Sequence, residues 1–352
     1  MSDIVETQYY VPVLKAKPGE KGALLAIADD LTPRVIPFLE IVERKKPSVK
    51  DHLDTAFKGL KECLQRYPRC FLDTIEIASD GTRAARLAFE RASAEGITFT
   101  PVTGLGRNAD VGPALDFGSS GLALRLTRKE AQSVDLAKEI HRFLERNGLT
   151  PERTDLVVDL GSVDDMIDVG VAALARDVLS RVPSSGKWRS LIVSATAFPF
   201  SMGCVARNSH ALMERSEWLA WKTGYSASKA GGARRPTFSD CAIQHPTGVE
   251  GFDPRLMQAS ATIRYTLTKD WLLIKGQGVR TRRPTLQFPE LASRLVDGDL
   301  KEHFFGPHHC AGCAAVQAAA DGKPGLGSLT VWRRIGTIHH VTLVAEQLVS
   351  EP

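Results

Sequence analysis

Carboxylates stand at or near the ends of four short apolar runs of this sequence. They are Glu40, Asp73, Asp159 and Asp240. A carboxylate within an apolar strand is costly unless it is paired with a cation or reaches water where the strand ends. Carboxylates in such places act as general acids or bases, or bind a hard divalent cation. We therefore predict that Glu40, Asp73 and Asp159 are catalytic and that Asp240 binds substrate.

Three cations occupy similar positions. Lys15 and Lys17 lie near the end of the first apolar run, and Arg125 lies in the fifth. Lysine and arginine side chains that lie close together favour an anionic group such as phosphate or carboxylate. We predict that these three hold the anion of a substrate. A buried layer of ion pairs without any ligand is the alternative, and a register shift of one residue would turn each side chain to the other face.

A second cluster of reactive side chains lies in HFFGPHHCAGCAA (303–315), with the pair His339–His340 further along. Cys310 and Cys313 have the spacing of half a zinc knuckle. Because there is no second CxxC motif, histidines are the candidates for the other ligands. They are His308, His309, His339 and His340, and we predict His309 and His339. The alternatives are a reduced cysteine pair at the start of a helix and a redox-active pair.

The segment WRRIGTIHH (332–340) combines an aromatic residue with basic ones. Trp332 beside two arginines offers stacking and phosphate contacts to a nucleic acid, although a tryptophan in a strand is also typical of a core. Arg333 and His340 are candidate substrate-binding residues. If the segment is a strand, His339 and His340 point to opposite faces, and only one of them can bind the metal.

The elements that must position these residues follow an even rhythm of apolar runs. Eight such runs occupy residues 9–17, 35–41, 70–77, 97–104, 121–128, 154–161, 190–198 and 236–243. Helical patterning, with apolar residues at steps of three and four, follows several runs. It covers 49–66, 82–95, 130–147 and 168–182. Eight strand–helix units predict a closed (βα)8 TIM-like barrel, whose chemistry lies at the carboxyl ends of its strands.

The pattern changes after Pro246. Residues 260–276 and 328–346 are rich in β-branched and aromatic residues and predict strands, while 288–303 and 314–320 predict helices. We therefore expect a barrel over 1–246 and a small α+β extension over 247–352, packed on it. Residues 209–222 look helical, and the glycine-, serine- and arginine-rich segment 223–236 predicts a mobile loop.

Composition narrows the class of protein. The 352 residues are 43% hydrophobic, and 45 basic against 41 acidic residues give a net charge of +4, too little to indicate nucleic-acid binding by itself. Motifs of dinucleotide-binding folds, P-loop NTPases, serine hydrolases and zincins are absent. The sequence has no signal peptide and no membrane-spanning run, and its six cysteines are mostly scattered. We expect a cytoplasmic protein.

Five segments together resemble the phage-type "beta protein" family of bacteria and their phages. They are YYVPVLKAKPGEKGAL, VIPFLEI, FSDCAIQHP, ATIRYTLTKDWLLIKGQG and WRRIGTIHHVTLV. The resemblance adds Arg264 and Tyr265 to the substrate-binding candidates and supports Lys15, Glu40 and His340. Cys241 departs from the pattern, where an aromatic residue is expected. The resemblance also implies a role in conflict between phage and host.

The first hypothesis is a barrel that binds or processes an anionic, phosphate-bearing ligand, in phage defence. As an enzyme it would be a hydrolase or lyase acting on a phosphate-bearing substrate. The alternative is a non-catalytic scaffold whose C-terminal region binds protein or nucleic acid of phage or host. Zinc or another divalent metal is the cofactor that the residues suggest, and the oligomeric state is left open.

Overall fold

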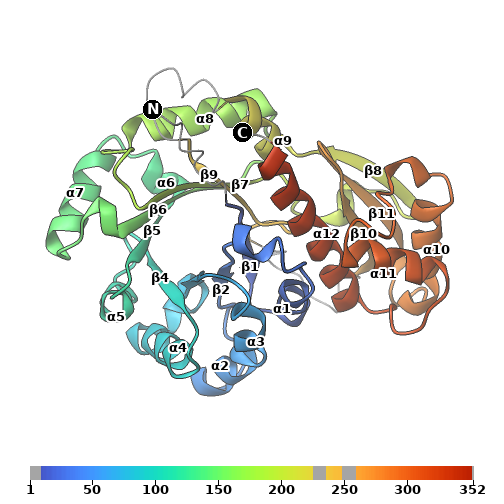
Figure 1. The fold of residues 1–352 in the computed structure, drawn as a ribbon, viewed down its shortest axis with the longest axis horizontal. Coiled ribbons are helices and arrows are strands. Elements are labelled where there is room, and N and C mark those ends of the chain that lie inside the picture. The colour runs from blue at the N-terminus through green and yellow to red at the C-terminus, as the bar shows by residue number, and fades with distance from the viewer. Residues whose placement is uncertain (1–8, 225–234, 248–258, 351–352) are drawn as a thin grey trace.

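Eight parallel strands close into a barrel in the order β1-β2-β3-β4-β5-β6-β7-β9 (Figure 1). The computed structural model describes residues 9–224, 235–247 and 259–350. The barrel strands are β1 Val11–Lys15, β2 Phe38–Glu40, β3 Cys70–Asp73, β4 Phe99–Thr103, β5 Leu122–Thr127, β6 Thr154–Ser162, β7 Ser190–Thr196 and β9 Thr237–Asp240. Each of the eight predicted apolar runs coincides with one of them to within one residue or contains it, and the predicted barrel is confirmed.

Helices surround the barrel and cover the outer face of its strands (Figure 1). They are α1 Pro18–Leu25, α2 Val49–Phe57, α3 Leu60–Leu64, α4 Thr82–Ala94, α5 Val111–Phe117, α6 Arg128–Ala131, α7 Leu136–Arg146, α8 Asp168–Arg181 and α9 Ser216–Gly224. The single helix expected over 49–66 is divided at Gly59. Its φ of +72° is a left-handed conformation that glycine adopts at little cost. The buried face of α7 holds Ile140 and Leu144, as its spacing predicts.

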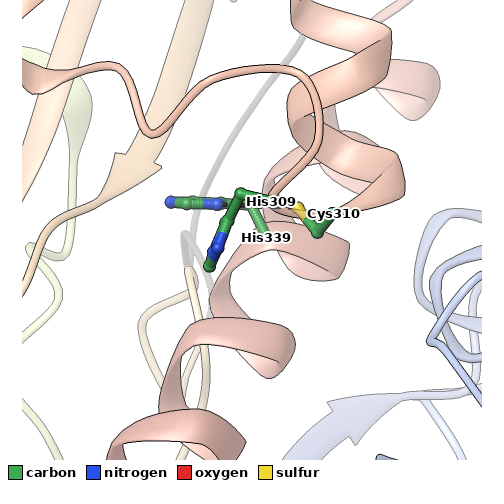
Figure 2. A group of neighbouring side chains, drawn as sticks. All are labelled: His309, Cys310 and His339. Atoms are coloured by element: carbon green, nitrogen blue, oxygen red, sulfur yellow. Dashed lines mark hydrogen bonds between the residues drawn. The ribbon is translucent and has the colours of Figure 1, made fainter. Parts of the chain in front are cut away.

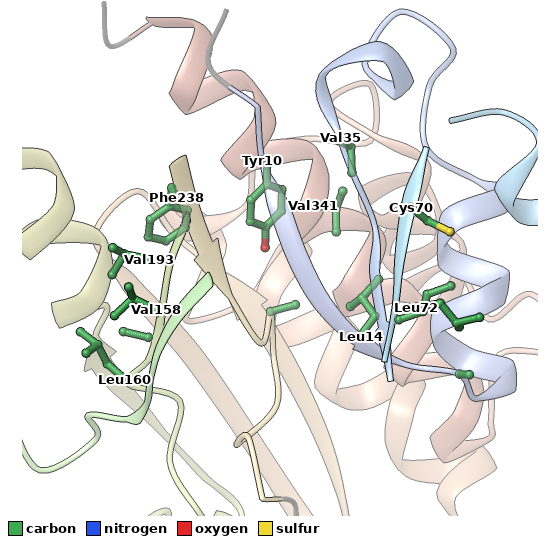
Figure 3. Packing of buried hydrophobic residues seen from close by; sticks show 14 of the residues in the cluster. Tyr10, Leu14, Val35, Cys70, Leu72, Val158, Leu160, Val193, Phe238 and Val341 are labelled. Carbon is green, nitrogen blue, oxygen red and sulfur yellow. The ribbon is translucent and has the colours of Figure 1, made fainter. Parts of the chain in front are cut away.

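Alternation along the strands separates two apolar layers. The inward side chains form a small core inside the barrel, made of Val11, Val13, Ile36, Phe38, Phe71, Val102, Ala123, Val157, Ile192 and Cys241. Outward side chains such as Leu14, Leu72 and Val158 pack against the helices in a larger core (Figure 3). Because side chains alternate with a period of two, inward Val13 and Phe38 place Lys15 and Glu40 on the inner face as well.

A three-stranded antiparallel sheet of order β10-β11-β8 forms the extension beside the barrel (Figure 1). Its strands are β8 Ser209–Glu214, β10 Ser260–Thr266 and β11 Asp270–Gly278. Its helices are α10 Pro284–Val296, α11 Ala311–Ala320 and α12 Leu329–Ser350. Helix α12 lies between the sheet and the barrel, where Val341 joins the core around β1 (Figure 3).

Two sequence-based expectations about these elements are wrong. Residues 329–346 belong to helix α12 and not to the strand expected over 328–346, because apolar side chains from Trp332 to Leu348 follow helical steps and are buried on most sides. Residues 209–214 form strand β8 and not the first turns of a helix. Their exposure alternates residue by residue, and they pair with β11 from Lys275 to Asp270.

The division expected after residue 246 stays a prediction. Strand β8 comes from before this point and belongs to the sheet of the extension. Most of the loop predicted over 223–236 lies outside the described residues. None of the helices in the described part of the chain is long and apolar enough to cross a membrane.

Candidate functional site

The carboxyl ends of the barrel strands bring five predicted site residues together in what we call the mouth ring. Its members are Lys15, Glu40, Asp73, Arg125 and Asp159. Strand register explains part of this arrangement, since Lys15 pairs with Glu40 across β1 and β2, and Glu40 with Asp73 across β2 and β3. All five side chains extend from the strands toward the same space.

Arg125 is the centre of the mouth ring. Its Nη1 donates to Oε1 of Glu40 at 2.6 Å and to Oδ2 of Asp73 at 2.8 Å. Its Nε and Nη2 donate to Oδ2 of Asp159 at 2.9 and 2.5 Å. The guanidinium carbon lies 5.2 Å from the ring centroid of Phe38, which closes the barrel interior below it. Each nitrogen of Arg125 is therefore engaged by a carboxylate.

Lys15 and Arg107 complete the ion pairs. Nζ of Lys15 lies 2.5 Å from Oε2 of Glu40 and also contacts Glu76. Arg107, in the segment between β4 and α5, pairs with Oδ1 of Asp73 at 2.6 Å and contacts Asp110. Burial alone would raise the pKa of Asp73, but the guanidiniums of Arg107 and Arg125 bring it below its ordinary value.

The mouth ring and its neighbours hold more acids than cations. The cations are Lys15, Arg107 and Arg125, and the acids are Glu40, Asp73, Glu76, Asp110 and Asp159. Burial would lower the pKa of Lys15, yet Glu40 and Glu76 raise it above its ordinary value. The lysine and the arginine predicted to hold an anion are thus already neutralised by carboxylates of the protein.

A pocket of about 250 Å³ lies at the rim of the mouth, and we call it the rim pocket. It is lined by Lys17, Pro18, Gly19, Glu20, Gln244, Leu329, Thr330 and Arg333. These residues come from the start of α1, the segment after β9 and the start of α12. A Cβ atom at Gly19 would lie 3.1 Å from Cγ of Arg333, so glycine permits the close approach of the two helices.

Positive charge gathers around the rim pocket. Burial lowers the pKa of Lys17 and of Arg333. The pKa of Arg264 is lowered mainly by burial and to a smaller extent by the positive charge of Arg333. Nη1 of Arg264 donates to the carbonyl oxygen of Ile243 at 2.7 Å. Glu20 is the nearby acid, and it accepts a hydrogen bond from Gln244 at 2.6 Å. Among the described residues, no carboxylate forms an ion pair with any of these three cations.

Two other candidates, Asp240 and His340, lie outside the mouth ring. Asp240 points outward from β9 and accepts a hydrogen bond from the hydroxyl of Tyr10 at 2.5 Å. Nε2 of His340 on α12 lies 3.1 Å from Oδ2 of Asp240, and Nδ1 lies 3.0 Å from Oγ1 of Thr266. All four side chains are buried. This group joins α12 to the barrel wall.

The structure brings the cysteine and histidine candidates close together. His309 and Cys310 lie on the segment that leads into α11, and His339 lies on α12 (Figure 2). One ligand atom from each of these three residues lies within 4.8 Å of the others. Sγ of Cys313 lies 3.3 Å from Nδ1 of His339 and 3.2 Å from the hydroxyl of Tyr265. We call His309, Cys310, Cys313 and His339 the thiol cluster.

A larger hollow of about 860 Å³ lies away from these groups. It is formed by the segment after β4, by α5 and by α7, with Gly106, Asn108, Glu139, Arg142 and Arg146 among its lining residues. None of the predicted site residues lines it. Volume alone therefore does not locate the candidate site in this barrel.

A sequence model of the Beta protein family matches residues 10–346, which is nearly the whole chain. The chain belongs to the Beta protein family. The predicted resemblance is thereby confirmed. Among curated proteins, none matches this family member.

Solved structures similar to this Beta protein family member are distant. A mandelate racemase/muconate lactonizing protein from Herpetosiphon aurantiacus aligns with 14% identity and a TM-score of 0.38, over 78% of this chain and 64% of its own. The YdjI aldolase of Escherichia coli K12 aligns with 10% identity and a TM-score of 0.31, over 98% and 92%. Deoxyribose phosphate aldolase from Aeropyrum pernix aligns with 12% identity and a TM-score of 0.27, over 64% and 93%.

Sequence reasoning missed several residues of these sites in the Beta protein family member. Arg107 and Asp110 follow the fourth strand in the polar segment GLGRNAD (104–110), and a charged pair directly after a strand was the available signal. Gln244 and Thr330 line the rim pocket but carry no charge that would single them out. Trp332, a candidate for nucleic-acid stacking, is buried and stacks on Phe288 with ring centroids 4.8 Å apart.

Proposed function

We propose that this Beta protein family member binds an anionic, phosphate-bearing ligand and that the rim pocket receives its phosphate group. The observation that carries the proposal is the excess of positive charge there. Lys17 and Arg333 line the pocket with one acid, Glu20, and Arg264 lies close enough to Arg333 for the two charges to repel; burial lowers the pKa of each of the three cations. A bound phosphate would offset this unfavourable charge with charge-assisted hydrogen bonds.

Two helices add to the attraction for an anion. Pro18 and Gly19 begin α1, and Leu329 and Thr330 begin α12, and all four residues line the pocket. The backbone N–H groups of a helix N-terminus carry partial positive charge and bind anions readily. Lys17, the residue that caps α1, makes no side-chain hydrogen bond to that helix. Its ammonium group has only hydrogen-bond donors and can contact an anionic ligand.

The remainder of the ligand would lie toward the mouth ring. Burial has the largest effect on the pKa of Lys17, followed by Glu20, Glu76 and Lys15. The rim pocket therefore lies next to the mouth ring. In this arrangement Lys15 and Arg125 are counter-charges of the carboxylates and do not contact the phosphate. Glu40, Asp73 and Asp159 stay predictions as catalytic residues, as does a hydrolase or lyase activity on the same ligand.

Calorimetric titration with inorganic phosphate and with pyrophosphate at constant ionic strength tests the proposal. We expect binding to the wild type and a loss of affinity of at least about tenfold in Arg333→Gln, because one charge-assisted hydrogen bond is removed. Arg334→Gln is the matched control, since Arg334 is the exposed neighbour on the same helix and does not line the pocket. Equal affinities in wild type and Arg333→Gln would refute the assignment.

The alternative of a scaffold that binds nucleic acid through WRRIGTIHH receives less support. Nε1 of Trp332 donates to the carbonyl oxygen of Leu326 at 2.6 Å, so the indole is enclosed by protein on its polar edge as well. A nucleic-acid complex would also weaken steeply with salt. A role in phage defence follows from the family resemblance alone and stays a prediction.

A further inference from the structure

The thiol cluster lies where three elements meet, apart from the rim pocket. Cys310 is the residue before α11, and its Sγ accepts a hydrogen bond from the backbone N–H of Cys313 in the first turn of that helix. His339 extends from α12. Tyr265 of β10 stacks on the imidazole of His339 with ring centroids 4.0 Å apart and planes 8° from parallel. The imidazole is thereby held in one orientation.

Hydrogen bonding decides which nitrogen of His339 is available. Nε2 lies 2.7 Å from the carbonyl oxygen of Thr266. A carbonyl oxygen only accepts, so Nε2 carries the hydrogen and Nδ1 of the neutral ring presents its lone pair. Nδ1 faces both sulfurs, 3.3 Å from Sγ of Cys313 and 3.7 Å from Sγ of Cys310. A backbone carbonyl on the far nitrogen is a usual way to orient a metal-binding histidine.

These separations fit a metal ion between the three groups. Zinc–sulfur and zinc–nitrogen bonds of about 2.3 and 2.05 Å at a tetrahedral angle place sulfur and nitrogen about 3.6 Å apart. The two sulfur–nitrogen distances at His339 lie on either side of this value.

His309 offers the fourth donor, with a ligand atom within 4.8 Å of those of Cys310 and His339. Its Nε2 is buried and has no hydrogen-bond partner among the residues that the structure describes. Its other nitrogen, Nδ1, lies 3.6 Å from Oε2 of Glu346. A carboxylate at the nitrogen that does not bind the metal is common in metal-binding histidines. The rings of His309 and His339 are 5.3 Å apart between centroids and meet at 70°, so they do not stack.

We infer that the thiol cluster is a tetrahedral zinc site, with ligands His309, Cys310, Cys313 and His339. Two thiolates and two imidazoles are the donor set of a closed structural zinc site. The ion would fasten the segment before α11 to α12. Binding would release the thiol protons of Cys310 and Cys313 to solvent, since the ligands must be deprotonated.

The test measures metal directly and needs no activity. Protein purified without chelator and under reducing conditions is analysed for zinc by elemental analysis and by native mass spectrometry. We expect one zinc per chain. Reconstitution of metal-free protein with cobalt(II) should give the absorption of a tetrahedral site with thiolate-to-metal charge transfer.

Variants locate the ion. Cys310→Ser and His309→Ala should each abolish stoichiometric zinc, whereas Cys204→Ser should keep it, because Cys204 is exposed and remote in sequence from the cluster. Phosphate binding at the rim pocket serves as a fold control, since the two sites share no residue. A variant that also loses phosphate binding is not interpreted. In its place, the wild type is treated with a chelator, and the release of zinc is followed with a chromogenic dye.

Three results would overturn the inference. One is wild-type protein that takes up no zinc in the reduced state. Another is zinc content unchanged in both cluster variants. The third is a Cys310–Cys313 disulfide that forms readily in metal-free protein while zinc never binds, which would replace the metal site with a redox pair. A failure of phosphate binding leaves the zinc result unaffected, so the two proposals fail separately.

Discussion

His340 on α12 and Asp240 on β9 form a completely buried pair, with 3.1 Å between Nε2 and Oδ2. Burial lowers the pKa of His340 below its ordinary value, although Asp240 opposes the shift. Burial alone would raise the pKa of Asp240, but His340 and Tyr10 bring it below its ordinary value. Both shifts mean that the folded chain binds fewer protons than the unfolded chain.

The first prediction concerns stability in mild acid. Because the folded-state pKa of His340 is below that of the unfolded chain, stability falls as the pH drops below about 6.5, the ordinary value of histidine. The pKa of Asp240 is also lowered in the folded chain, so protonation of its carboxylate at lower pH reduces stability further. His340→Gln should cost about 1–3 kcal/mol at pH 7.5 and flatten the dependence between pH 7.5 and 5.5. Chemical unfolding at a series of pH values measures both, and an unchanged slope would contradict the prediction.

The second prediction concerns the mouth ring. Arg125→Met leaves Glu40, Asp73 and Asp159 without their shared cation, and we expect a loss of about 3–5 kcal/mol in the free energy of unfolding at pH 7. The loss should shrink at pH 5, where unpaired carboxyls take up protons more readily. Arg86→Met removes an exposed pair with Asp116 and should cost at most about 1 kcal/mol. Equal losses in the two variants would mean that the ring is not a buried network.

The third prediction sets binding against stability. In the absence of phosphate, Arg333→Gln should stabilise the protein by about 0.2–1 kcal/mol, because the repulsion between Arg333 and Arg264 is removed and the site is partly open to solvent. The same variant should gain no stability from added phosphate, unlike the wild type. Thermal unfolding with and without phosphate measures both effects. Destabilisation in the absence of phosphate would show that Arg333 is a structural residue.

The fourth prediction concerns Glu217 on α9. Burial raises its pKa to about 8, with Arg215 opposing the shift and Asp240 adding to it. Its Oε1 is buried without a hydrogen-bond partner among the described residues. The folded chain keeps this proton while the unfolded chain loses it near pH 4.3, so Glu217 reduces stability as the pH rises from about 4 to about 8.

Glu217→Gln should remove this dependence. Relative to the wild type, the variant should gain about 1–3 kcal/mol between pH 5 and pH 8.5. Glu214→Gln on β8 is the matched control, since Glu214 is exposed, and it should follow the wild type. Parallel stability curves for Glu217→Gln and the wild type would show that the carboxyl is already ionised in the folded protein.

The barrel and its mouth could be predicted because strand periodicity carries that information. A parallel strand is covered on both sides, so its apolar runs are continuous, and a charged residue near the carboxyl end stands out, as Glu40 and Arg125 do. The inward or outward direction of a single residue was less certain. Ser239 and Cys241 continue the inner face of β9, which turns Asp240 outward to His340.

The extension was harder to predict because packing overrides local preference there. Helix α12 is rich in β-branched residues, which favour strands, but it is buried against both the barrel and the sheet, and burial decides its structure. Lys17, Arg264 and Arg333 come from β1–α1, β10 and α12. Their closeness to one another depends on how these elements are packed, which no local pattern in the sequence describes.

The position of β8 has a consequence for where the chain can be cut into fragments. The strand is placed in the chain between β7 and β9 of the barrel, yet among the described residues it pairs only with β11 of the other sheet. A fragment that stops at residue 246 would keep β8 without its partner and expose an open strand edge, which favours aggregation. Recombination at that point would separate the same two strands. The chain therefore cannot be divided at residue 246 without loss of the pairing between β8 and β11.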